Sequence, residues 1–187
     1  MQSSTQDQML AVYRKNWVWF LTFGILIEIL GLYALLALTA TTLISVMLIG
    51  VLLIIGGIIV IIGALTSWRH QIGSFLLHLL LGILYVAAGT ILIKHPVVGS
   101  ISITFILGIF FTIIGIFRLI DSLTFRYVHW GWVFLNGIIS LLLGILIMTS
   151  WPVSGLYIIG LFVGIDLVFC GWAYIMGAIG ARNYIKK

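Results

Sequence analysis

The sequence predicts an all-α membrane protein with six transmembrane helices built from three parallel helical-hairpin repeats. Hydrophobic residues make up 63% of its 187 residues and charged residues only 7%, whereas soluble proteins carry about 25% charged residues. This small number of charged residues could not cover the surface of a soluble domain of this size. The solvent around most of the chain is therefore lipid. Glycines that recur at a fixed spacing indicate the internal repeats.

The positions of the charged residues divide the chain into helices of about 20 residues, the length that spans a bilayer. Two stretches without a formal charge, Ile29–Trp68 and Tyr127–Ile165, are long enough for two helices each, and two shorter ones, Gln71–Ile93 and His95–Phe117, hold one helix each. Pro152 places a turn in the second long stretch, because proline removes a backbone donor and disfavours helix before it. The expected helices are Trp17–Leu38, Leu43–Leu65, Ile72–Ile93, Val97–Ile120, Trp130–Thr149 and Val153–Ala178.

The distribution of basic residues predicts the orientation. A polar N-terminal tail, residues 1–16, precedes the transmembrane domain of residues 17–181, and a basic tail of residues 182–187 follows it. Eight of the nine Lys and Arg residues lie on the side of the termini and only Lys94 lies on the other, so the positive-inside rule places both termini in the cytoplasm. These cations are spread over tails and helix ends, which favours the lipid bilayer over nucleic acid as their partner.

Glycine pairs seven residues apart recur three times along the chain. The two pairs in the first third of the sequence return at equivalent places in the second third and again in the last third, and Pro96 and Pro152 follow the same register. The chain is therefore read as three consecutive hairpins, at about 17–69, 72–126 and 130–182. Seven residues are nearly two helical turns, so each pair places two small residues on one face, where a neighbouring helix can approach closely. The expected helix-packing residues are Gly24, Gly31, Gly50, Gly57, Gly82, Gly89, Gly108, Gly115, Gly137, Gly144, Gly164 and Gly171.

Two acids stand inside the expected helices. Glu28 and Asp166 each lie about eleven residues, or about 16 Å, from the start of their helix, where an ionisable group is costly and is a functional candidate by default. Glu28 shares a face with Gly24 and Gly31, whereas Asp166 lies about 200° around its helix from Gly164. Three roles remain open for these acids: a neutral hydrogen-bonded structural group, a proton-responsive group, or a ligand for an ion or substrate.

His78 is the third ionisable candidate, four residues before Gly82 on the same helix face, as a packing residue or as a pH sensor. The motifs of catalysis and metal binding, such as Cys-x-x-Cys and His-Glu-x-x-His, do not occur in the sequence, so no enzymatic activity, catalytic residue, metal site or cofactor is expected. No small-molecule substrate can be identified either. Gly160 and Gly164 form a small-xxx-small pair, which is compatible with a homo-oligomer or with another membrane protein as partner.

Four segments together have a pattern that resembles a known family. They are Gly82-Ile83-Leu84…Gly89…Pro96, Gly108…Gly115-Ile116…Arg118, Gly137-Ile138…Gly144-Ile145-Leu146…Pro152 and Gly164-Ile165-Asp166-Leu167-Val168-Phe169. With them, the region Trp17–Ala181 resembles the HdeD family of small bacterial inner-membrane acid-resistance proteins, which carries an acid in the last segment. The resemblance implies a non-enzymatic, multi-pass protein of the bacterial inner membrane that is linked to acid stress.

Three functions follow as hypotheses. In the first, protonation of Asp166, and of Glu28 with it, biases the packing of the glycine-lined helices as the external pH falls. In the second, the protein is a small proton- or cation-coupled transporter or channel in which these acids bind the ion. In the third, it is a structural or assembly partner of other membrane proteins, and the acids are hydrogen-bonded within the fold.

Overall fold

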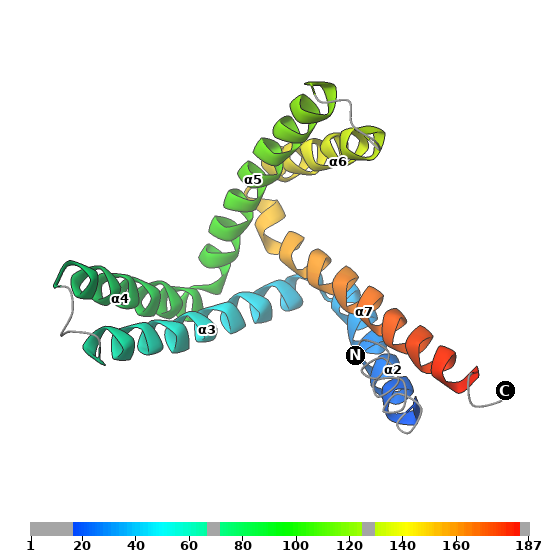
Figure 1. The fold of residues 1–187 in the computed structure, drawn as a ribbon, viewed down its shortest axis with the longest axis horizontal. Helices are drawn as coiled ribbons and strands as arrows, with labels where there is room; N and C mark the ends of the chain where they lie inside the picture. The colour runs from blue at the N-terminus through cyan, green and yellow to red at the C-terminus, as the bar shows by residue number, and fades with distance from the viewer. Residues whose placement is uncertain (1–16, 67–71, 125–129, 184–187) are drawn as a thin grey trace, which may run out of the picture. The chain divides into compact units, whose positions relative to one another are not determined.

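The computed structural model describes residues 17–66, 72–124 and 130–183, which form six long helices and one short 3-10 helix (Figure 1). In chain order they are α2 (Trp17–Leu36), α3 (Leu38–Thr66), α4 (Ile72–Lys94), α5 (Pro96–Thr124), α6 (Trp130–Thr149), η1 (Val153–Leu156) and α7 (Ile158–Asn183). All six long helices are long and apolar enough to cross a membrane, which confirms the predicted all-α membrane fold. The expected N-terminal tail lies outside the described residues.

The first connection is shorter than the sequence predicted. α3 begins at Leu38 rather than Leu43, and Ala37 alone interrupts the helical pattern. The Ala37 N–H donates to the Tyr33 carbonyl (3.0 Å) and the Thr41 hydroxyl donates to the Ala34 carbonyl (3.1 Å). These bonds give polar groups at the break partners within the protein, which a bilayer requires. The threonine-rich segment therefore stays helical instead of forming a loop.

The connection between α4 and α5 differs from the connection between α6 and α7. His95 alone separates α4 from α5, whereas η1 precedes α7, so the last helix begins at Ile158 rather than at the expected Val153. The buried Ser154 hydroxyl donates to the Ile147 carbonyl (2.9 Å) at the end of α6. The residues that follow α6 therefore form the short helix η1 before α7 begins.

The chain divides into two compact units. One consists of residues 1–41 and 160–187 and holds α2 with most of α7; the other consists of residues 42–159 and holds most of α3, with α4, α5, α6 and η1. Inside these units the twelve expected helix-packing glycines, called the seam glycines below, join helices into three antiparallel pairs: α2·α7 in the first unit, and α3·α4 and α5·α6 in the second. Figure 1 shows the helices of each pair running side by side.

These pairs are offset by one helix from the hairpins of the sequence repeat. The glycines of α3 contact α4, which belongs to the next repeat, and those of α7 contact α2 at the other end of the chain. Two helices that pack antiparallel need a connection of about 2–5 residues, and the single residue Ala37 between α2 and α3 is too short for it. The terminal helices therefore form a third pair of the same kind as the other two.

This pairing predicts that the chain tolerates circular permutation. When residues 187 and 1 are joined by a flexible linker and the chain is opened between residues 67 and 71, all three pairs keep both helices. We expect this permutant to unfold within about 3 °C of the wild type in the same detergent, a difference below about 1 kcal/mol. A permutant opened inside α5, at residues 104–105, is the control and should not fold. A permutant opened at 67–71 that fails to fold would contradict the α2·α7 pair.

Candidate functional site

One packing rule governs all three helix pairs. Each seam glycine lies against the residue four positions after a glycine of the partner helix. At Gly57, for example, an added Cβ would lie 2.8 Å from the Gly82 oxygen and 2.8 Å from Cγ2 of Val86. We call the twelve residues that follow this rule the seam positions: Glu28, Leu35, Ile54, Ile61, Val86, Ile93, Thr112, Leu119, Leu141, Met148, Val168 and Ile175.

Glu28 is the charged member of this otherwise uncharged set. A Cβ added to Gly171 would lie 2.7 Å from the Glu28 nitrogen and 2.9 Å from its Cα, so the backbones of α2 and α7 meet at this residue. The Glu28 side chain is half-buried. Its equivalents in the α3·α4 and α5·α6 pairs are Val86 and Leu141, so the packing itself does not require an acid at this position.

Asp166 lies on the same helix pair but outside its seam. It is exposed on α7, while the next two residues, Leu167 and Val168, contact Gly31 of α2. Glu28 is level with Gly171, which is five residues or about 7.5 Å along the helix axis from Asp166. Within the described ranges neither carboxyl makes a hydrogen bond or an ion pair. The structure therefore brings the two acids to one helix pair without joining them.

An aromatic cluster closes the seam one turn from Glu28. Tyr174 of α7 stacks on Phe20 (ring centroids 6.5 Å apart) and meets Phe23 edge-on (6.1 Å). The Tyr174 Cβ also lies 3.0 Å from the place of a Cβ on Gly24. Aromatic side chains therefore line the contact between α2 and α7 on the side of Glu28 toward the start of α2.

The remaining predicted candidate lies elsewhere. His78 is exposed on α4 and belongs to the other unit, so the structure does not place it with the acids in one site. Among the described residues, no group of three or more His, Cys, Asp or Glu side chains comes together as a set of metal ligands.

The structure adds a polar site between α5 and α6. Arg118 of α5 donates from Nη1 to the Ser140 hydroxyl (3.1 Å) and to the Asn136 amide oxygen (3.4 Å), both on α6. Its Cβ lies 3.2 Å from the place of a Cβ on Gly137, so the stem of the side chain is part of the seam. The sequence spacing could have indicated this contact. Arg118 lies three residues after Gly115, just as Tyr174 lies three residues after Gly171, and both residues contact a glycine of the partner helix.

Six apolar helices, repeated glycine seams and an acid in one seam define a multi-pass α-helical membrane protein built from internal repeats. The family described as Short repeat of unknown function (DUF308) matches residues 22–94 and 81–149. The two matches cover more than half of the chain, which therefore belongs to the DUF308 family. They begin just before Gly24 and Gly82, two glycines at equivalent places in the repeat, so the family repeat follows the glycine register. No curated protein and no solved structure matches the chain.

Proposed function

We propose that this protein is a non-enzymatic protein of acid-stress resistance in the bacterial inner membrane, with both termini in the cytoplasm, and that it responds to protons through Glu28. The observation that carries the proposal is the place of Glu28 as the charged residue among the twelve seam positions, backbone to backbone with Gly171. The HdeD-like segments support the link to acid stress, and the excess of basic residues on the side of the termini supports the orientation.

The response follows from the cost of charge in an apolar seam. An ionised carboxylate between α2 and α7 costs at least about 2 kcal/mol in the membrane, whereas a protonated carboxyl carries no net charge. A fall in pH therefore favours close packing of α2 on α7. Asp166, exposed on the same pair, gives this pair a second protonatable group.

The proton is the ion that fits best. A metal cation such as Ca²⁺ or Mg²⁺ needs about six oxygen ligands, and Glu28 has no acidic neighbour in the seam formed by α2 and α7. A single carboxyl is sufficient to bind one proton.

A proton-coupled transporter or channel is the second candidate. The presence of both intramembrane acids on the α2·α7 pair favours it, because acids within spans also line proton pathways. A structural or assembly role for the protein, in which neither acid titrates, is the third.

Acid survival and proton flux separate these candidates. We expect a deletion strain complemented with Glu28→Lys, which stays charged in acid, to survive an acid challenge no better than the deletion strain itself, while Asp121→Asn, an acid on the α5·α6 pair, rescues it like the wild type. Immunoblots of the membrane fraction check that all variants are present in equal amounts. In proteoliposomes under an inward pH gradient, we expect no proton flux above that of protein-free liposomes.

Each alternative has its own signature. Flux that disappears in Glu28→Gln or Asp166→Asn would replace the proposal with the transporter. Full acid survival of Glu28→Lys without flux would contradict proton sensing and leave the assembly role.

A further inference from the structure

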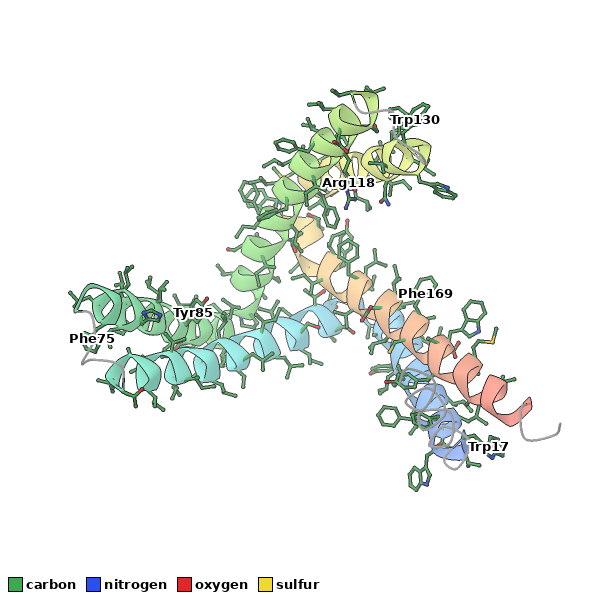
Figure 2. All side chains as sticks on the ribbon, viewed as in Figure 1. Trp17, Phe75, Tyr85, Arg118, Trp130 and Phe169 are labelled. Carbon is green, nitrogen blue, oxygen red and sulfur yellow. The ribbon has the colours of Figure 1, made fainter. Side chains whose placement is uncertain are left out.

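We propose that Arg118 and Asn136 form a binding site for the phosphate group of an anionic phospholipid on the α5·α6 pair. The starting point is the charge of Arg118. Its guanidinium is always ionised in proteins, it is exposed, and its two partners on α6, Asn136 and Ser140, are neutral. These hydrogen bonds fix the position of the guanidinium but leave its positive charge uncompensated by α6. Figure 2 shows Arg118 on α5 beside α6.

The packing of the helices does not require this charge. The residues equivalent to Arg118 in the other pairs are Val60 and Tyr174, and those pairs keep the same glycine register with uncharged side chains there. Arg118 lies near the end of the predicted span Val97–Ile120, where a long cationic side chain can reach the headgroup layer. Its presence at one of three equivalent positions therefore points to binding rather than to packing.

The donors are arranged to hold an anion. Both bonds to α6 use Nη1, so α6 leaves the N–H groups on Nη2 and Nε unengaged. Asn136 accepts through its oxygen, which leaves its amide NH₂ as a donor beside the guanidinium. Ser140 is only 5% exposed and anchors Nη1 from the buried side. A planar guanidinium with an adjacent amide donor suits the oxygens of a phosphate.

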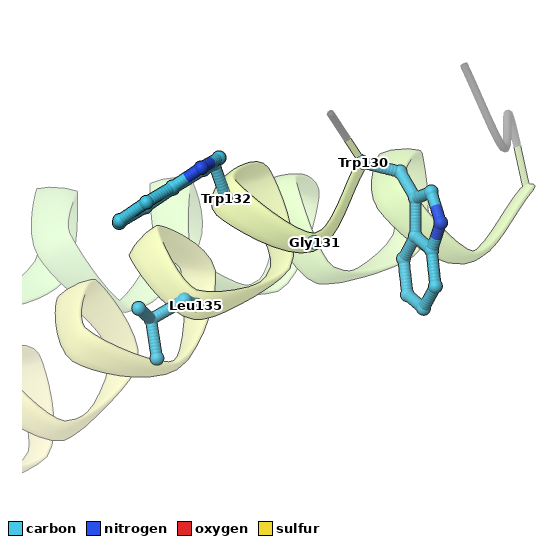
Figure 3. Close-up of a pocket in the computed structure, with 4 residues that line it drawn as sticks. All are labelled: Trp130, Gly131, Trp132 and Leu135. Carbon is cyan, nitrogen blue, oxygen red and sulfur yellow. The ribbon is translucent and has the colours of Figure 1, made fainter. Parts of the chain in front are cut away.

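A hollow lies on α6, the helix that carries Asn136. It has a volume of about 350 Å³ and is lined by Trp130, Gly131, Trp132 and Leu135 at the start of α6 (Figure 3). Trp132 precedes Asn136 by four residues, so the two share a helix face. A Cβ added to Gly131 would meet nothing within 4 Å, and Trp132 is 71% exposed. Exposed tryptophans mark the headgroup layer of a bilayer, where phospholipid phosphates lie.

The test titrates the full-length protein in detergent with phosphatidylglycerol and follows bound lipid by native mass spectrometry. Arg118→Gln should weaken the apparent affinity about tenfold, the loss expected for one charge-assisted pair. Arg118→Lys should lose about fivefold, because an ammonium keeps the charge but not the planar fork of donors. Asn136→Leu should lose about threefold. The control Lys94→Gln removes a cation at the end of α4 and should bind like the wild type.

The same titration can overturn the proposal. Wild-type affinity in Arg118→Gln would show that the lipid binds elsewhere, and wild-type affinity in Arg118→Lys would show that charge alone attracts it; either result contradicts the proposed site. Inorganic phosphate that displaces the bound lipid at millimolar concentration would show a site for a soluble anion instead. If Arg118→Gln does not fold in phosphatidylcholine–detergent micelles, Arg118→Lys and Asn136→Leu decide, and wild-type affinity in both contradicts the site.

Discussion

Replacing Gly57 with leucine should lower the unfolding temperature of the protein by about 10 °C, which corresponds to about 3 kcal/mol for a chain of this size. A Cβ at Gly57 would lie 2.8 Å from the backbone oxygen of Gly82 and 3.0 Å from Cβ of Tyr85. Backbone atoms cannot move aside as the end of a flexible side chain can, so leucine would force α3 and α4 apart. The helices would then lose the close approach that small residues provide in lipid.

The neighbouring Gly56 supplies a matched control. It lies on the same helix, but a Cβ there would meet nothing within 4 Å. Gly56→Leu should leave the unfolding temperature unchanged or raise it slightly, since leucine is a better helix former than glycine by about 0.8 kcal/mol. Circular dichroism melts of both variants in one detergent make the comparison. An equal loss of stability in Gly56→Leu and Gly57→Leu would show that the packing between α3 and α4 does not depend on the face that carries Gly57.

The sequence was sufficient to predict the six helices and the equivalence of the repeats, but not which helices pair. A repeat along the chain shows that Gly50 and Gly108 occupy equivalent positions. It does not show whether the glycine face of α3 meets α2 or α4, because both neighbours carry the same glycine spacing. The length of each connection decides between them, and the one-residue break at Ala37 became visible only in the structure. The expected helix bounds leave the threonines after it in the connection, because spacing along the chain does not show their hydrogen-bond partners.

The candidate site was also only partly predictable from the sequence. Angles around a single helix can be counted from the sequence, which is why Glu28 was assigned to the glycine face of its helix and Asp166 to another face. Contacts between helices depend on the register of one helix against its partner. The meeting of Glu28 with Gly171 and the bonds from Arg118 to Ser140 are of this second kind, and no spacing within one helix encodes them.

Replacing Glu28 with valine should raise the unfolding temperature at neutral pH by about 6 °C, which corresponds to about 2 kcal/mol. Val86, the equivalent residue, packs against Gly57, so a valine fits this position in the same register. At a lower pH the wild type should gain more stability than Glu28→Val, because protonation removes the charge only where the carboxyl is present. Thermal unfolding at the two pH values in one detergent measures both effects.

The reciprocal substitution tests whether the effect comes from a charge in a glycine seam rather than from Glu28 itself. Val86→Glu places a carboxyl at the equivalent seam position of α3·α4, and in the Glu28→Val background it should lower the stability at neutral pH by a similar amount and restore the gain in acid. A loss of stability in Glu28→Val would contradict the proposed sensing, since it would mean that the carboxyl is held by a favourable interaction, as in the assembly role. Stabilisation by Glu28→Val together with a pH response that moves with the carboxyl to α3·α4 would identify charge in a glycine seam as the element that couples this fold to acid.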